Sequence, residues 1–175
     1  MGKDKSRRAD LVDRLTDHVL AHGLGAASLR PLAAAAGTSD RMLLYYFPDK
    51  AALVGAVLEA AATRMTVLLD AHRCHEPRSP AALHDHLIPF VLDDALWPFM
   101  QLWLEIASQA ARGDPLCRQV GEGIARGFLA WICEQLVAES SDARRIDATQ
   151  VLMRVEGAVL LKSLGLALEV EQATS

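Results

Sequence analysis

The chain has 175 residues, which is enough for one compact body with a sizeable core and short for two independent domains. Hydrophobic residues make up 51% of it and aromatic residues 5%, and the strand-forming runs of Val, Ile, Thr and aromatics are missing, so we predict an all-α protein. Residues 1–50 hold eight Lys and Arg against six Asp and Glu, while the rest holds ten against sixteen. A slightly basic N-terminal part on an acidic body suits a polyanionic partner at one end only.

The three cysteines are an odd number with no close pair, and the N-terminus lacks the apolar run of a secretory signal, so we expect a reducing cytoplasm. The most apolar stretch, 155–168, contains Lys162 and is shorter than the roughly 20 residues of a membrane span, so we expect no membrane contact. The sequence has no Gly-rich phosphate loop, metalloprotease helix motif or nucleophile elbow, so we predict neither an enzyme nor a cofactor.

Two helices are predicted at the N-terminus, each ended by a glycine. Apolar residues at helical spacing indicate the first helix over 8–22, and Gly23 stands where a left-handed residue closes a helix. Ser28 can cap the second helix, which Gly37 ends.

A short third helix follows at once. Ser39 can cap it, it covers 40–47, and Pro48 stops it because proline cannot donate the next helical bond. Two short helices joined by a glycine turn form a helix-turn-helix, whose second helix enters the major groove of DNA. A fourth helix over 50–72 would join this head to the rest of the chain.

The rest of the chain is predicted to be helical as well. The expected helices cover 83–93, interrupted or bent at Pro89, then 98–111, 116–139 and 143–169. We therefore predict about nine helices, divided into an N-terminal domain over 1–50 and a C-terminal domain over 51–175.

The stretch from Ser28 to Leu53 resembles the N-terminal signature of the tetracycline-repressor (TetR) family of bacterial transcription regulators. The shared elements are a capping Ser, an Ala-Gly turn, a Ser opening the third helix, an aromatic pair ending it, and Lys50 two residues after Pro48. The likeness covers roughly residues 8–58. It implies a helix-turn-helix head on a helical ligand-binding and dimerisation domain. It also implies a regulator, usually a repressor although activation would use the same parts, that binds a palindromic operator as a homodimer and is released by a small molecule.

The predicted DNA contacts lie in the head: they are Ser28, Arg30, Ser39, Arg41, Met42, Tyr45, Tyr46 and Lys50. Arg41 and Met42 are in the first turn of the third helix, where a guanidinium suits guanine and a thioether packs on a thymine methyl. The resemblance implies that Tyr46 reaches a phosphate and that Tyr45 lies near the groove. The serines and Arg30 are expected to contact phosphates, which position the helix without reading sequence.

Several of these positions have a plain structural alternative. Met42 could fill the core, Tyr45 could pack on a neighbour, and Lys50 could pair with a carboxylate. A positive charge in the first turn of a helix is disfavoured by about 0.3–1 kcal/mol, which a phosphate would reverse. Leu44 departs from the family, which often has a phosphate-binding Tyr there; either the contacts shift to Tyr46 and Lys50, or Leu44 packs inward.

Aromatic and Met residues of the C-terminal part are predicted to line a pocket for a hydrophobic or aromatic small molecule, although the same residues could simply form the core. The predicted ligand contacts are Trp97, Phe99, Met100, Trp103, Glu105, Phe128, Trp131, Met153 and Glu156. The two glutamates interrupt apolar segments, and a buried carboxylate needs a partner. That partner is either a polar ligand or an arginine such as Arg112, Arg126 or Arg154.

The last predicted helix is apolar on more than one face over 152–168, which one packing partner cannot cover. We therefore predict a homodimer, and the resemblance implies a four-helix bundle between the copies. The predicted dimer contacts are Leu152, Val155, Val159, Leu160 and Leu164.

Two alternatives remain from the sequence. A cluster of potential metal ligands comprises His72, Cys74, His75, His84 and His86, but its spacing matches no known structural zinc site, so we predict no metal. The other alternative is a ligand-binding or protein-interaction module with weak or lost DNA binding, which the overall acidity and Leu44 would fit.

Overall fold

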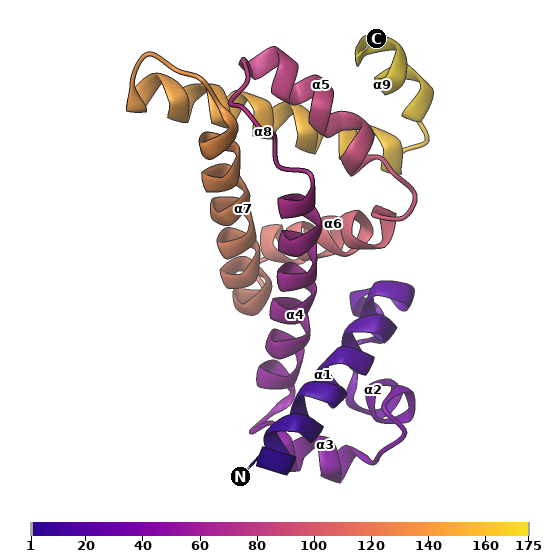
Figure 1. Cartoon of the computed structure of the whole chain (residues 1–175). Helices are drawn as coiled ribbons and strands as arrows, with labels where there is room; N and C mark the ends of the chain where they lie inside the picture. Colours follow the sequence, from indigo (N-terminus) through magenta and orange to yellow (C-terminus); the bar gives the residue numbers. More distant parts are fainter. Residues whose placement is uncertain (1, 175) are drawn as a thin grey trace. The chain divides into compact units, whose positions relative to one another are not determined.

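A computed structural model describes residues 2–174, which form nine α-helices and one short 3₁₀ helix (Figure 1). The elements are α1 (Gly2–His22), η1 (Leu24–Ala26), α2 (Leu29–Ala35), α3 (Asp40–Tyr46), α4 (Lys50–Ala71), α5 (Pro80–Val91), α6 (Trp97–Ala111), α7 (Pro115–Gln135), α8 (Ser141–Ser163) and α9 (Ala167–Thr174). Within the described part no strand is formed, and the predicted all-α class is confirmed.

The end of the chain differs from the prediction of one helix over 143–169. Gly165 has φ 87°, its amide bonds to the carbonyl of Lys162, and the amide of Leu166 bonds to the carbonyl of Leu161. This pair of bonds with a left-handed glycine is the Schellman motif, which ends a helix. The chain therefore forms two helices, α8 and α9, in place of one.

α7 is also shorter than predicted, because it ends at Gln135 instead of continuing to residue 139. Arg78 donates its amide to the carbonyl of Gln135 at 2.7 Å, and its own carbonyl accepts from the amide of Val137 at 2.9 Å. These two bonds form an isolated parallel bridge that draws the chain out of helical conformation.

The chain folds as two compact units that do not follow one cut in the sequence. The first contains the chain up to Leu68 together with Leu102–Gly121, and the second contains Leu69–Gln101 and the chain from Glu122. Helices α4, α6 and α7 thus contribute residues to both units. The predicted division into a DNA-binding domain over 1–50 and a ligand-binding and dimerisation domain over 51–175 concerns function, and it stays a prediction.

The first unit holds the helix-turn-helix. α1 packs on η1 and α2, and α2 packs on α3 (Figure 1). Its fully buried side chains come from all four N-terminal α-helices: Leu15, Leu32, Leu43, Phe47, Leu53 and Leu58. Burying one such side chain is worth about 1.5–3 kcal/mol, so this small core is what holds α3 in place.

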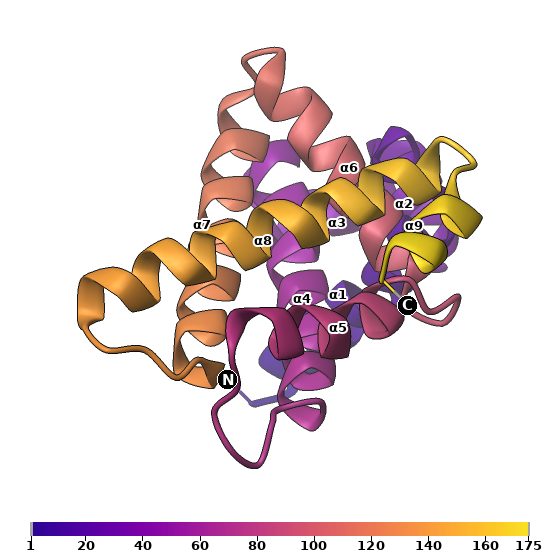
Figure 2. The same ribbon diagram turned by 90° about the horizontal axis from the view of Figure 1, so that it is seen from above.

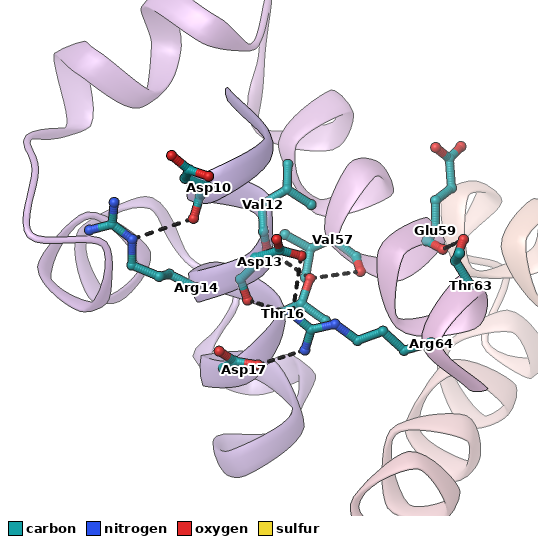
Figure 3. Close-up of polar contacts among 10 residues, drawn as sticks. All are labelled: Asp10, Val12, Asp13, Arg14, Thr16, Asp17, Val57, Glu59, Thr63 and Arg64. Carbon is teal, nitrogen blue, oxygen red and sulfur yellow. Dashed lines mark hydrogen bonds and ion pairs between the residues drawn. The ribbon is translucent and has the colours of Figure 1, made fainter. Parts of the chain in front are cut away.

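Hydrogen bonds and ion pairs connect α1 to α4 (Figure 3). The guanidinium of Arg64 donates to Asp17 Oδ1 at 2.6 Å and to Asp13 Oδ1 at 3.2 Å. Burial alone would lower the pKa of Arg64, but the hydrogen bonds to the two aspartates raise it above its ordinary value, so the group stays charged. The buried Thr16 hydroxyl donates to the carbonyl of Val12 at 2.8 Å and approaches that of Val57 at 3.5 Å.

The second unit is centred on α5 and α8, which lie side by side, with α9 packed against α8 (Figure 2). The buried side chains of α5 and α8 include Leu83, Leu87, Val91, Val151, Val155 and Val159. In the same unit, the indole of Trp131 donates to Asp70 Oδ1 at 3.1 Å and lies beneath the guanidinium of Arg73, so α7 is tied to the end of α4.

α4 is long and apolar enough to cross a membrane, judged by length and composition alone. Its Leu53, Val57 and Leu58, however, are buried in the core of the first unit, and its Arg64 is paired with α1. Only 33% of its apolar window is buried inside the structure, so core packing accounts for part of the apolar character of this helix.

Candidate nucleic-acid interface

The turn between α2 and α3 is built by backbone hydrogen bonds around a glycine. Gly37 has φ 63°, its amide bonds to the carbonyl of Ala34, and the amide of Thr38 bonds to the carbonyl of Ala33. α3 then begins under the side chain of Ser39, whose Oγ accepts from the amide of Met42 at 3.3 Å. The predicted helix-turn-helix and the capping role of Ser39 are confirmed.

One face of α3 is buried and the other is open. Leu43 and Phe47 are buried against the core, whereas Met42, Leu44 and Tyr45 are 42%, 44% and 71% exposed. The alternatives in which Met42 fills the core or Leu44 packs inward are therefore wrong. α3 therefore exposes several apolar side chains, and Leu44 is one of them although it was not among the predicted contacts.

The two tyrosines contact each other edge to face, with ring centroids 5.1 Å apart. Tyr45 is exposed and Tyr46 is half-buried. Tyr45 therefore packs on the ring of Tyr46 and is open to solvent at the same time. Their adjacent positions on a helix, about 100° apart, require this difference.

Lys50 is exposed at the first position of α4, beside an acidic cap. Asp49 Oδ1 accepts from the amide of Ala52 at 2.8 Å. The carboxylate thus already occupies one of the free amides at this helix end and offsets the unfavourable dipole at Lys50. The exposed Lys50 side chain is available to a phosphate here.

The other predicted contacts also lie on α2 and the first turn of α3. Ser28 is the residue before α2 and makes no side-chain cap hydrogen bond, while Arg30 and Arg41 are exposed. All the predicted DNA contacts therefore belong to the α2–α3 pair and its flanks. Their contact with DNA stays a prediction.

The predicted ligand residues are divided between the two units. Trp103 and Glu105 belong to the first unit, and Trp97, Phe99, Met100, Phe128, Trp131, Met153 and Glu156 belong to the second. Met100 and Trp131 are buried, and the remaining aromatics are half-buried.

Two of these ligand assignments need correction or restatement. Met153 is 69% exposed on α8, so it does not line an interior wall as predicted. Glu105 has a partner that the sequence did not suggest: its Oε2 accepts from the backbone amide of Leu24 at 2.6 Å. Glu156 is half-buried on α8.

The predicted dimer contacts fall on two different faces of α8. Val155 and Val159 are only 2% and 1% exposed within the protomer, so they have no surface to offer a second copy, and this part of the prediction is wrong. Leu152 is half-buried, whereas Leu160 and Leu164 are exposed. Exposed large apolar side chains of α8, α9 and the turn between them that were not among the predicted dimer contacts are Ile146, Met153, Leu161, Leu166 and Leu168.

The histidines of the His and Cys cluster make other contacts in the structure. The ring of His72 stacks on Phe90, His86 Nε2 lies 3.0 Å from the carbonyl of His72, and His84 Nδ1 lies 3.0 Å from Asp85 Oδ1. Among residues 2–174, no group of three or more His, Cys, Asp and Glu side chains could hold a metal ion.

Comparison with known proteins connects this interface to regulators of transcription. Residues 18–57 match the family model of bacterial regulatory proteins, tetR family, which confirms the resemblance found in the sequence. The HTH-type transcriptional regulator BetI of Burkholderia thailandensis is 25% identical over 154 residues, which are 87% of this chain and 78% of that protein.

Solved structures agree in fold. A transcriptional regulator from Rhodococcus sp. Rha1 is similar with a TM-score of 0.74 at 20% identity, over 95% of this chain and 91% of that one. The multidrug binding protein EbrR, in complex with imidazole, is similar with a TM-score of 0.65 at 22% identity, over 91% and 80%. At these identities the structures show a shared fold.

Proposed function

We propose that this chain, a transcription regulator of the TetR family, represses genes by binding a palindromic operator as a homodimer and leaves the operator when a small-molecule effector binds. The observation that carries the proposal is the open face of α3, which presents Arg41, Met42, Leu44 and Tyr45 above a buried Leu43 and Phe47. A rigid helix with a cationic and apolar outer face suits the floor of a major groove. The regulator acts in the cytoplasm, where its operator is.

Binding would use two heads at once. Helix-turn-helix dimers read half-sites about 34–36 Å apart, one turn of DNA, so the separation of the two α3 helices has to match the operator. Phosphate contacts from Tyr46, Lys50 and the serines would fix each head on the backbone, and the outer face of α3 would read the bases.

Selection of duplexes from a random DNA pool tests the DNA-binding function. We expect the purified protein to enrich a palindrome. A Tyr46→Phe/Lys50→Ala variant should bind it about 10–100-fold more weakly, and the salt slope should fall by roughly 1 for each phosphate that the variant no longer neutralises. Phe keeps the ring contact with Tyr45 and removes only the hydroxyl.

The matched control is Arg126→Ala, which removes an exposed cation on α7 that pairs with Glu122. It should leave operator affinity unchanged. No enrichment at low salt, or equal affinities for all three proteins, would contradict the proposed interface.

The apolar face of α3 predicts a particular kind of base reading. Met42 and Leu44 can make favourable contacts with the C5 methyl group of thymine, so replacing single thymines of the selected half-site by uracil should weaken binding at the contacted positions. Losing one buried methyl costs about 0.8 kcal/mol, or about fourfold in affinity. In a Leu44→Ala protein the same substitution should cost less. Anisotropy titration of the substituted duplexes measures this, and uracil without effect at every position would contradict the assignment.

The homodimer is supported by exposed apolar side chains on α8 and α9. Leu160, Leu161, Leu164 and Leu168 are exposed in the single chain. A contiguous apolar patch on a protein surface commonly marks an interface, and most homo-oligomers are twofold symmetric dimers.

The effector is proposed to be a hydrophobic or planar compound, because Trp97, Phe99, Trp103 and Phe128 are half-buried aromatics. Effector and DNA would oppose each other with a coupling of about 1–3 kcal/mol, which acts equally in both directions. A compound that releases labelled operator should therefore bind the DNA-free protein more tightly than the complex by the same factor. Release without this reciprocity would contradict the mechanism.

A further inference from the structure

Glu105 of α6 reaches the corner between α1 and α2, from a position 81 residues further along the chain. Its Oε2 accepts from the amide of Leu24 at 2.6 Å. Leu24 is the first residue of η1, and the cap residue Gly23 supplies no side-chain hydrogen bond of its own. A carboxylate from a distant helix thus provides the cap that the local sequence lacks.

The backbone at this corner is shaped around the carboxylate. Gly23 has φ 78°, a conformation that side chains disfavour, and its amide closes α1 by bonding to the carbonyl of Val19 at 2.8 Å. A Cβ added to Gly23 would clash with Glu105 Oε1 and would stand 3.1 Å from Oε2. Only glycine therefore permits both the turn and the close approach of Glu105.

The other contacts of α1 lie elsewhere along it. Arg64 holds the middle of α1 through Asp13 and Asp17, and Arg14 Nη1 donates to the carbonyl of Ala36 at 3.2 Å. Buried Leu32 keeps α2 in the core. Removal of the Glu105 carboxylate would therefore leave the head folded and would free the α1–α2 corner, because a hydrogen bond with a charged acceptor is among the stronger polar contacts.

We propose that Glu105 is a positioning residue for DNA binding: it fixes the α1–α2 corner to α6 and thereby sets the orientation in which α2 and α3 are presented to the operator. The inference rests on the proposed function, since the orientation matters only if two heads must match two half-sites. Glu105 itself touches no DNA in this proposal and acts through Leu24.

The test compares operators of altered spacing. The selected palindrome is rebuilt with one or two base pairs inserted or removed between the half-sites, and wild type, Glu105→Ala and Glu105→Gln are titrated against each duplex. We expect wild type to lose tenfold or more at the wrong spacings, as a fixed separation of heads requires, and Glu105→Ala to lose only about twofold. Glu105→Gln keeps an acceptor oxygen and should recover part of the discrimination.

Two further variants separate positioning from simple stability. Gly23→Ala should reproduce the loss of spacing discrimination with Glu105 still present, since the added Cβ displaces the carboxylate. Glu122→Gln removes a carboxylate that pairs with Arg126 on the surface of α7 and should behave as wild type. A merely stabilising Glu105 would change the melting temperature and leave the ratio of affinities between spacings as in wild type, and that result would overturn the proposal.

Hydrogen exchange gives a readout that needs no DNA. Amides of the segment 23–27 should exchange faster in Glu105→Ala, while those of α3 stay protected. Unchanged exchange would overturn the proposal even if the operator is bound. If wild type selects no duplex, the proposed function is contradicted. Faster exchange in Glu105→Ala would in that case still show that the hydrogen bond from Leu24 to Glu105 forms in solution.

Discussion

A Phe47→Ala protein should lose about 3–5 kcal/mol of its free energy of unfolding, the usual cost of emptying a fully buried aromatic site. Phe47 is 1% exposed at the end of α3, and the guanidinium of Arg8 lies 4.6 Å from the centre of its ring. The substitution removes the side chain that joins the end of α3 to the core and to α1. DNA binding should therefore disappear together with the folded head. Urea unfolding followed by circular dichroism measures the first effect and anisotropy the second.

Tyr45→Ala is the matched control, because it removes an aromatic ring two residues earlier on the open face of the same helix. Its unfolding free energy should change by no more than about 0.5 kcal/mol, the usual limit for surface sites, while its operator affinity falls. Equal loss of stability in the two variants would mean that α3 does not have the buried and open faces described above.

The head was predictable because its signals are local. The glycine at 37, the cap at Ser39 and the proline at 48 mark the ends of α2 and α3 within a few residues, and helical periodicity then separates Leu43 and Phe47 from Tyr45. The exposed positions of α3 follow from that separation, whereas the DNA-contact roles of Tyr45 and Tyr46 came from the family resemblance. The same periodicity places Leu44 on the outer face of α3. Leu44 was not named as a contact because the family often has a tyrosine there.

What could not be predicted depends on residues far apart in the sequence. Nothing near Glu105 indicates that its carboxylate caps η1, and nothing near Gln135 indicates that Arg78 ends α7. The faces of α8 posed a similar problem. A helix that is apolar on several faces is expected to have more than one partner, but the sequence cannot say that Val155 and Val159 are buried in the protomer while Leu164 is exposed.

A Leu160→Glu/Leu164→Glu protein should be a monomer at micromolar concentration and should bind the full operator about 10²–10⁴-fold more weakly, because the second head then no longer binds as part of the same molecule. The two leucines are 50% and 67% exposed in the single chain, so the charges disturb no packing within the protomer. In a dimer they would place four carboxylates in an apolar interface, where unpaired charges are costly. Sedimentation and anisotropy measure the two effects.

The matched control carries the same charges on exposed valines elsewhere in the chain, Val67→Glu/Val137→Glu, and should remain a dimer with full affinity. A duplex with a single half-site distinguishes impaired dimerisation from a damaged head. The monomeric variant should bind this duplex with the same affinity per head as wild type, since α3 is unchanged. If the leucine variant sediments as a dimer, the copies do not meet at this face of α8. A wild-type protein that is itself a monomer on the operator would remove the need for a fixed half-site spacing, and with it the mechanism in which an effector acts on two heads together.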